Sequence, residues 1–302
     1  MVRILVTDGM DQESVKELKD LGYEVVEQFF EPEDLKKQVK EFNILIVRSA
    51  TKVKKDIIDE ALETKNLKLI IRGGVGVDNI DVSYAKANGI DVRNTPLASS
   101  LSVAELALAH MFGLARFIGL SNITMREGKW EKKKYTGIEL SGKTLGIIGF
   151  GRIGRELAKK ASALGMRVIY HDILGQIKDL PEFDFVSQDE LLAQSDFISL
   201  HIPGSKDKSP VFGKAEFLKI KDGAYLINCA RGTVVDERAL LEALNYGKLA
   251  GVGIDVFSEE PTKNMELVKH EKVSVTPHIG ASTKEAQKRI GAEIVSIIKE
   301  RF

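Results

Sequence analysis

Short runs of β-branched and other apolar residues alternate along this chain with longer stretches in which apolar residues recur every three or four positions. The runs have the composition of strands and the stretches have the period of amphipathic helices, so the pattern predicts repeated β–α units. Runs such as residues 44–47 (ILIV) and 67–71 (LKLII) are almost continuously apolar, which is typical of parallel strands covered by helices on both faces. The pattern therefore predicts an α/β fold.

The β–α units form two series, and between them lies an apolar segment at 102–120 (SVAELALAHMFGLARFIGL), which predicts one long helix. Strands of the first series are expected within residues 2–9, 23–28, 43–50, 67–74 and 90–96. Strands of the second are expected within residues 143–151, 166–172, 196–203, 224–230, 251–257 and 273–280, before a final helix at 283–302. In a chain of 302 residues, two series of this size indicate two domains.

The second series begins with a glycine motif of the type GxGxxG, formed by Gly149, Gly151 and Gly154. It follows a predicted strand, opens a predicted helix and precedes Asp172 at the end of the next strand, as in dinucleotide-binding units. The first glycine allows a tight turn, the second lets a pyrophosphate approach the helix N-terminus, and the third lets helix and strand pack closely. Asp172 would bind the adenosine ribose and repel a 2′-phosphate, so the motif predicts NAD rather than NADP.

A second glycine-rich stretch, residues 72–78 (RGGVGVD), has no third glycine at the required offset. Consecutive free amides in such a loop can hold a small anion, so the stretch predicts a contact with a carboxylate rather than with a dinucleotide. Val75 and Gly76, at the centre of the stretch, are the candidates for that contact.

Histidine is the side chain best suited to move a proton near neutral pH, and the chain has 5 of them. His278 follows a predicted strand, at the edge where ligands bind in open α/β sheets. Arg231 and the acids Glu259 and Glu260 also follow strands of the second series, so a base, an acid and a cation are expected together; the alternative for each is a solvated loop charge. For the other histidines we expect a core position at His110, solvent at His270, and strand ends near the cofactor at His171 and His201.

Composition narrows the classes of function. The 44 basic and 44 acidic residues balance, so no net charge favours a nucleic acid or an anionic membrane as partner. The single cysteine, Cys229, excludes an internal disulfide and a thiolate zinc cluster and fits a reducing compartment. No apolar segment approaches the roughly 18 residues that span a bilayer, and the N-terminus lacks the features of a secretory signal. We therefore expect a cytoplasmic protein with a small-molecule substrate and no metal.

Four segments carry a resemblance to a known family: residues 149–154 (GFGRIG), 226–236 (LINCARGTVVD), 253–261 (GIDVFSEEP) and 276–282 (TPHIGAS). They resemble the D-isomer-specific 2-hydroxyacid dehydrogenases, which are NAD-dependent oxidoreductases. The resemblance implies a Rossmann-type NAD domain, residues 97–282, inserted into a flavodoxin-like substrate domain, residues 1–96 and 283–302. Both domains would be doubly wound parallel sheets.

The resemblance also implies a catalytic triad of Arg231, Glu260 and His278. In the implied reaction a hydride passes from C2 of a D-2-hydroxy acid to NAD while His278 takes the hydroxyl proton. Glu260 would favour the charged imidazole and fix its tautomer, and Arg231 would bind the substrate carboxylate and polarise the C2 oxygen. Asp255 falls where the family contacts the nicotinamide carboxamide. Further cofactor contacts are implied at Arg152, Ile153, His201, Pro203, Cys229, Ala230 and Gly280.

Within the family, residues 47–53 (VRSATKV), 72–81 (RGGVGVDNID) and 94–96 (NTP) resemble the branch that oxidises 3-phosphoglycerate to 3-phosphohydroxypyruvate in serine biosynthesis. That resemblance implies that Arg48 and Arg72 hold the phosphate, a role suited to the bidentate guanidinium. Residues 98–100 depart from it, because they are Ala-Ser-Ser where the branch usually has Gly-Asn-Ser. The alternatives are a glyoxylate or hydroxypyruvate reductase and, from another class, an NAD-sensing corepressor that binds without needing turnover.

Members of the family form dimers through the nucleotide domain, so a homodimer is expected. The apolar segment from Val103 to Leu120 is the candidate interface, and burial of that segment between the lobes of one subunit is the equal alternative. The chain resembles a short form of the family, without the C-terminal regulatory domain of longer members.

Overall fold

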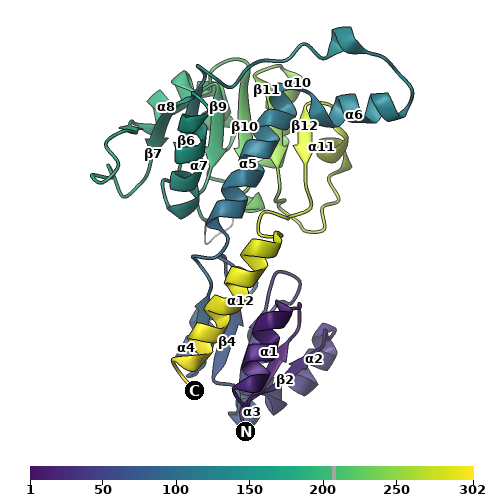
Figure 1. Cartoon of the computed structure of the whole chain (residues 1–302), viewed down its shortest axis with the longest axis vertical. Coiled ribbons are helices and arrows are strands. Elements are labelled where there is room, and N and C mark those ends of the chain that lie inside the picture. Colours follow the sequence, from purple (N-terminus) through teal and green to yellow (C-terminus); the bar gives the residue numbers. More distant parts are fainter. Residues whose placement is uncertain (206–208) are drawn as a thin grey trace. The chain divides into compact units, whose positions relative to one another are not determined.

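The computed structural model of the protein describes residues 1–205 and 209–302. They divide into two compact units. Unit 1 comprises Met1–Ser99 and Ala281–Phe302, and unit 2 comprises Ser100–Gly280. Both units are built on parallel sheets with helices packed against them (Figure 1). The predicted fold class, two parallel-sheet α/β domains, is therefore confirmed.

The strands of unit 1 form a parallel sheet with the order β2-β1-β3-β4-β5, which is the flavodoxin-like order. The strands are β1 (Arg3–Val6), β2 (Glu24–Glu27), β3 (Ile44–Val47), β4 (Leu69–Arg72) and β5 (Asp91–Asn94). The helices are α1 (Gln12–Asp20), α2 (Pro32–Gln38), the 3₁₀ turn η1 (Val39–Glu41), α3 (Lys55–Thr64), α4 (Val82–Ala87) and α12 (Lys284–Lys299).

Both faces of this sheet are buried because neighbouring residues of a strand point to opposite sides. Leu45 of β3 belongs to a core shared with α2 and α3. Ile44, one position earlier, belongs to a second core shared with α1 and α12, and Figure 1 shows these two helices side by side. The two cores explain why the ILIV run is apolar at every position, and they seat the C-terminal helix in the N-terminal unit.

Unit 2 contains a parallel sheet with the order β12-β11-β10-β9-β6-β7-β8. Counted from β6, this is the Rossmann order 3-2-1-4-5-6 with one strand added. The strands are β6 (Thr144–Ile148), β7 (Arg167–His171), β8 (Asp184–Phe185), β9 (Phe197–Leu200), β10 (Ala224–Asn228), β11 (Leu249–Ile254) and β12 (Val273–Val275). The helices are α5 (Ser100–Ala115), α6 (Ile118–Arg126), η2 (Lys132–Lys134), α7 (Arg152–Ala163), α8 (Gln188–Gln194), α9 (Lys214–Lys219), η3 (Gly232–Val234), α10 (Glu237–Asn245) and α11 (Met265–Lys269).

The single helix expected at 102–120 is two helices, so that prediction is wrong. Phe117 adopts a left-handed conformation with φ 55°, which ends α5, and α6 then continues at an angle of 62°. Most of one side of α5 is buried on the sheet, together with α7. Among the described residues, no single helix is long and apolar enough to cross a membrane, and only the bent pair of α5 and α6 reaches that length and composition.

Candidate active site

Arg231, Glu260 and His278 leave the carboxyl ends of β10, β11 and β12, which are neighbours in the sheet of unit 2. Because the carboxyl ends of parallel strands meet at one edge, segments far apart in the sequence come together there. Arg231 precedes η3, Glu260 lies in the loop between β11 and α11, and His278 lies in the turn after β12.

His278 and Glu260 form a hydrogen-bonded pair, with 2.7 Å between Nδ1 and Oε2. A carboxylate can only accept, so Nδ1 carries the hydrogen and Nε2 is left to exchange a proton with another molecule. The other oxygen of Glu260 accepts the backbone N–H of Phe257 at 3.1 Å. Both side chains are about one-third exposed, 34% for His278 and 36% for Glu260, so the pair is accessible.

The carboxyl of Glu260 is held in its charged form. Burial alone would raise the pKa of Glu260, but the hydrogen bond and charge of His278, with smaller contributions from the Phe257 amide and the Arg231 charge, keep that pKa below its ordinary value. The persistent anion accepts the hydrogen of Nδ1 and so fixes the tautomer of the imidazole.

The turn that carries His278 is fixed by Asp255, which is only 1% exposed. Asp255 Oδ1 accepts the N–H of Ile279 at 2.8 Å and Oδ2 accepts the N–H of Gly280 at 2.8 Å. The N–H of His278 bonds the Asp255 carbonyl at 2.8 Å, and His278 itself has φ 53°. The structure thus gives Asp255 a role in shaping the turn; its contact with the nicotinamide carboxamide stays a prediction.

A buried chain of hydrogen bonds extends from Asp255 to helix α5. Thr276 donates its hydroxyl to Asp255 Oδ1 at 2.6 Å, and His110 Nε2 lies 3.1 Å from the same hydroxyl oxygen. Since that hydroxyl hydrogen is already given to the carboxylate, His110 must donate from Nε2 and accept at Nδ1, where Ser274 Oγ lies at 2.9 Å. His110 is 3% exposed. It is a core histidine with both ring nitrogens bonded, and sequence reasoning did not foresee its link to Asp255.

Arg231 is presented by a backbone turn that Asn228 holds. The side-chain oxygen of Asn228 accepts the N–H of Ala230 at 3.1 Å, and its amide donates to the Arg231 carbonyl at 3.0 Å. Arg231 Nη1 donates to the Ala230 carbonyl at 2.6 Å. Asn228 is 3% exposed. Sequence reasoning gave it no role, although it opens the NxARG motif.

The glycine motif has the geometry that a dinucleotide needs. Gly149 has φ 92°, and a Cβ there would lie 2.5 Å from the His201 carbonyl oxygen. A Cβ on Gly154 would lie 2.5 Å from the Gly149 carbonyl oxygen, whereas a Cβ on Gly151 would meet nothing within 4 Å. Two glycines are therefore required by close packing inside the fold, and Gly151 leaves open space at the N-terminus of α7 for an anion.

Asp172 lies beside this loop. Its Oδ2 accepts the N–H of Phe150 at 2.7 Å and its Oδ1 accepts the N–H of Leu174 at 2.9 Å. The carboxylate is thus fixed against the backbone of the glycine motif, where a ribose joined to the pyrophosphate would be within reach.

His201 follows the end of β9 and is partly buried, and its Nε2 lies 2.9 Å from Ser199 Oγ. Within the described part of the chain no group bonds its buried Nδ1, and burial lowers the pKa of His201 to about 4. Burial also raises the pKa of the Cys229 thiol. A neutral imidazole with an open nitrogen and an uncharged thiol fit an uncharged portion of a cofactor. The remaining expected contacts lie at the same edge, with Pro203 after β9, Ala230 after β10, and Arg152 and Ile153 at the start of α7.

The candidate substrate residues of unit 1 also gather at strand ends. Val47 of β3 pairs in register with Arg72 of β4, so Arg48 and Arg72 leave the same edge. A Cβ on Gly73 would lie 3.5 Å from Arg48 Cγ, and a Cβ on Gly74 would lie 1.7 Å from Arg72 Nη1. Both arginine side chains therefore run along the glycine-rich loop.

Two further contacts fix this edge of unit 1. Asp8, which sequence reasoning passed over, accepts the N–H groups of Arg48 at 2.7 Å and Thr51 at 3.0 Å. Asn94 donates its side-chain amide to the carbonyl of Val75, which holds the loop that contains Val75 and Gly76. No cluster of three or more His, Cys, Asp or Glu side chains among the described residues could hold a metal ion.

Comparisons with known proteins agree with this geometry. Residues 108–280 match the family model "D-isomer specific 2-hydroxyacid dehydrogenase, NAD binding domain". A hydroxypyruvate reductase of Thermotoga maritima is 46% identical over 99% of this chain and 98% of its own length. A D-3-phosphoglycerate dehydrogenase of Methanocaldococcus jannaschii is 43% identical over 99% of this chain, which spans 57% of that longer relative.

A solved structure of D-lactate dehydrogenase from Aquifex aeolicus, complexed with NAD and lactic acid, superposes with a TM-score of 0.85 at 32% identity, covering 98% of this chain and 94% of that one. The matched NAD-binding domain and this NAD complex agree with the open glycine loop and the carboxylate beside it, so the cofactor is NAD. The chain belongs to the D-isomer-specific 2-hydroxyacid dehydrogenase family and is an NAD-dependent oxidoreductase.

Proposed function

We propose that the protein interconverts 3-phosphoglycerate and 3-phosphohydroxypyruvate, and that Arg48 and Arg72 bind the phosphate group. The supporting observation is the pair of arginines at the ends of two adjacent strands, with both side chains running along the glycine-rich loop of residues 72–78. A phosphate dianion is best bound by several guanidinium and backbone N–H donors acting together. The relative from Methanocaldococcus jannaschii, a D-3-phosphoglycerate dehydrogenase, lends further support.

The chemistry would be carried out in unit 2. Bound NAD would accept a hydride from C2 of the hydroxy acid. His278 would take the hydroxyl proton at Nε2, because Nδ1 is engaged by Glu260 at 2.7 Å. Arg231 would bind the carboxylate of the substrate and stabilise negative charge on the C2 oxygen. In the reverse direction the charged His278 would return the proton from Nε2, while Glu260 holds the ring through Nδ1.

A second candidate substrate is hydroxypyruvate, which lacks the phosphate. It is favoured by the Thermotoga maritima relative, named a hydroxypyruvate reductase, which this chain matches over 98% of its length. The departure at residues 98–100 from the phosphoglycerate pattern points the same way.

A substrate panel separates the two candidates. Oxidation of NADH would be followed with 3-phosphohydroxypyruvate, hydroxypyruvate and glyoxylate at equal concentrations. Two charge-assisted contacts to phosphate predict kcat/KM at least about tenfold higher for the phosphorylated keto acid than for hydroxypyruvate. Equal or reversed values would overturn the phosphate assignment and favour hydroxypyruvate, and absence of turnover with all three would favour a binding protein.

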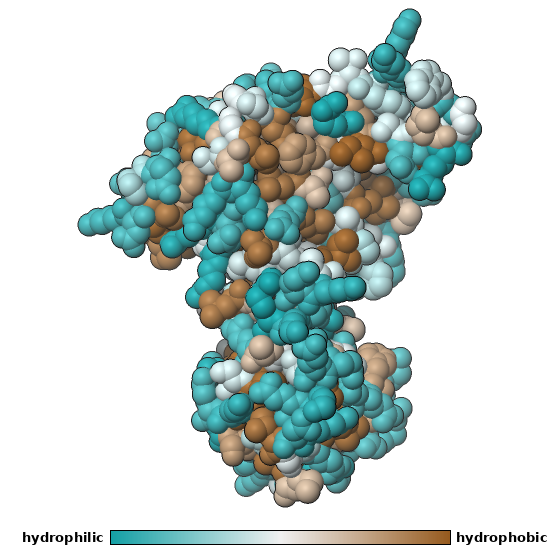
Figure 2. Space-filling view, viewed as in Figure 1, coloured by the Kyte–Doolittle hydropathy of each residue, from teal (hydrophilic) through white to brown (hydrophobic). Residues whose placement is uncertain are grey.

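We also propose that the protein is a homodimer joined through α5 and α6. In the described part of the chain α6 has no buried side chain, although Ile118, Ile123 and Met125 are apolar and 54%, 55% and 53% exposed. Figure 2 shows apolar side chains gathered on the face of unit 2 along α5, where Phe112 is 38% exposed. A contiguous apolar surface of this kind is typical of an interface.

A further inference from the structure

Glu237, the first residue of α10, holds the loop that carries the proposed site residue Glu260. Its Oε1 accepts the backbone N–H of Ser258 at 2.8 Å, and its Oε2 accepts the side-chain amide of Asn264 at 2.8 Å. Ser258 and Asn264 lie on either side of Glu260 in the loop between β11 and α11. Both oxygens of one carboxylate therefore hold the loop from which Glu260 reaches His278.

A helix N-terminus does not by itself require this arrangement. An acid in the first turn is favoured by the helix dipole, but two of the first N–H groups of α10 are already bonded by its cap. Asp236 accepts the N–H of Arg238 at 2.9 Å and of Ala239 at 3.1 Å. The carboxylate of Glu237 turns away from its own helix and bonds the neighbouring loop, so its contacts are tertiary.

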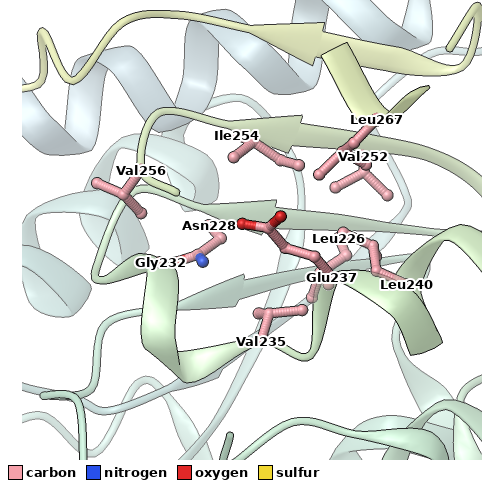
Figure 3. A pocket seen from close by; sticks show the side chains of 10 residues that line it. All are labelled: Leu226, Asn228, Gly232, Val235, Glu237, Leu240, Val252, Ile254, Val256 and Leu267. Carbon is pink, nitrogen blue, oxygen red and sulfur yellow. The ribbon is translucent and has the colours of Figure 1, made fainter. Parts of the chain in front are cut away.

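The small cavity in front of Glu237 also indicates that its carboxylate bonds other parts of the protein rather than a ligand. Figure 3 shows the carboxylate of Glu237 among side chains from β10, β11 and the start of α10, with Asn228 and Gly232 nearby. The cavity has a volume of about 10 Å³, which is room for no more than one water molecule. No ligand would fit, so the carboxylate serves the protein itself.

Gly232 makes a second contact with the same loop. A Cβ at this position would lie 1.8 Å from the carbonyl carbon of Phe257 and 2.5 Å from the nitrogen of Ser258. The residue after Arg231 thus packs directly on the backbone that starts the Glu260 loop. The Arg231 segment, Glu237 and the Glu260 loop are thus in direct contact within unit 2.

We propose that Glu237 is a positioning residue that acts through the 257–264 loop to keep Glu260 bonded to His278. The inference rests on the proposed roles of Glu260 and His278. Glu260 reaches the imidazole with a flexible side chain, and its second oxygen bonds Phe257 N–H of the same loop at 3.1 Å. The site therefore depends on the loop backbone, which Glu237 bonds through Ser258 and on which Gly232 packs closely.

The first test is Glu237→Gln, which keeps the size of the side chain but replaces one acceptor oxygen with an NH₂ group. That NH₂ group would face either the Ser258 N–H or the Asn264 amide, both of which are donors. Reduction of the preferred keto acid would be measured from pH 6 to pH 10, with NADH affinity and melting temperature as controls for folding. We expect kcat to fall about tenfold, since a charge-assisted hydrogen bond is lost, with NADH affinity within about twofold of the parent. Glu242→Gln is the matched control, because Glu242 lies on the same helix and contacts only Arg238 at 3.8 Å among the ion pairs described.

The pH profile separates positioning from general destabilisation. Reduction needs the charged imidazole, so activity falls at high pH, and loss of the neighbouring anion moves the midpoint of that fall to lower pH. We expect the midpoint to move in this direction in Glu260→Gln, and to move less but in the same direction in Glu237→Gln. A variant that was only less stable would keep the midpoint of the parent enzyme.

A second variant keeps the test decisive if Glu237→Gln does not fold. Asn264→Asp retains an oxygen to cap α11, a cap now made by Asn264 Oδ1 to the N–H of Leu267 at 3.2 Å, but replaces the donor to Glu237 with an anion. It should shift the pH midpoint in the same direction. In a double-mutant cycle, Glu237→Gln should reduce kcat by no more than about twofold once Glu260 is already Gln.

The outcomes distinguish the inference from the function on which it rests. Independent, multiplicative losses in the cycle, or a parental pH midpoint in both loop variants, would overturn the role of Glu237 while Glu260→Gln still showed its own loss. If Glu260→Gln itself kept the parental rate and midpoint, the proposed role of Glu260 would be wrong, and the inference would fall with it.

Discussion

Gly253 of β11 lies so close to α5 that a Cβ at this position would be 2.6 Å from the Cβ of His110. The contact seats α5 on the sheet and brings the His110 ring to the hydroxyl of Thr276. A glycine in a strand interior is ordinarily unfavourable, and here it is explained by this approach. Because residue 253 has no side chain, α5 can pack on the sheet and His110 can contact the turn that carries His278.

Gly253→Ala should therefore destabilise the protein by about 1–3 kcal/mol, because the overpacked helix must shift. Urea unfolding monitored by circular dichroism would measure the change in the free energy of unfolding. Gly113→Ala in α5 is the control: a Cβ there would lie 3.8 Å from its nearest atom, so alanine should stabilise the helix by up to about 1 kcal/mol. Equal effects of the two substitutions would contradict the packing argument.

Features that follow from local chemistry and chain order were predictable from the sequence. The motif of Gly149, Gly151 and Gly154 predicts the turn and the helix that it forms. The alternation of β–α units predicts that the carboxyl ends of the strands meet at one edge of the sheet. For that reason the sequence alone predicts that Arg231 and His278 lie at a common edge of the sheet.

Features set by tertiary packing were not predictable. The partners of His110, Asp8 and Glu237 come from distant segments, and no residue pattern in one segment reveals which carboxylate bonds which loop. The break at Phe117 was missed because the apolar pattern continues through it without proline, and the glycines at 113 and 119 flank the break rather than mark it.

His278→Gln should lower kcat by a factor of about 10² to 10⁴, the usual contribution of a placed proton-transfer group. The affinity for NADH, measured by fluorescence titration, should stay within about threefold, because the imidazole exchanges a proton with the substrate rather than binding the cofactor phosphates. His270→Gln provides the control at a histidine outside the site. A loss of tenfold or less in His278→Gln would refute the assignment.

Arg48→Gln and Arg72→Gln should raise KM for 3-phosphohydroxypyruvate by about tenfold or more, while kcat/KM for hydroxypyruvate changes by less than about threefold. The difference arises because only the phosphorylated substrate uses the second anion contact. Arg93→Gln, on the neighbouring strand β5 with Glu300 at 3.9 Å, should leave both values unchanged. Parallel losses with both substrates would show that the arginines do not recognise phosphate.

Ile123→Glu should convert the proposed dimer to a monomer at micromolar concentrations, because it places a charge in the apolar surface of α6. Sedimentation equilibrium would report the mass directly. Leu218→Glu, at a residue that is 71% exposed on α9, should leave the mass unchanged. A parent protein that is already monomeric would remove the basis for the interface.

Acid should destabilise the free enzyme between pH 6.5 and pH 4. The folded-state pKa of His201 is lowered by burial to about 4, below the roughly 6.5 of an unfolded histidine. Between these two pKa values the unfolded chain binds the proton and the folded chain does not. The contribution of His201 to the free energy of unfolding is therefore complete above pH 6.5, and it falls by up to about 1.4 kcal/mol for each unit by which the pH is lowered. Burial also lowers the pKa of His110, which acts with the same sign.

Urea unfolding of the parent and of His201→Gln at pH 7, 6 and 5 would test this, and the variant should show a shallower loss of stability with acid. Glu260 does not affect this measurement. Its pKa is lowered in the folded state, so its contribution to the free energy of unfolding is lost only at a pH below the ordinary pKa of a carboxyl. Identical slopes for the two proteins would contradict the role of the buried imidazole.

The division of the chain at residues 99/100 and 280/281 has a consequence for how such an enzyme can change. The proton-handling pair lies wholly in the inserted unit, and the arginines proposed to choose the substrate lie in the other. A shuffled gene could therefore acquire a new substrate preference by exchanging its two outer segments together, leaving the redox machinery untouched. A single crossover would instead combine the N-terminal sheet of one protein with the C-terminal helix of another, although these elements share one core. Exchange of both outer segments together keeps that core intact.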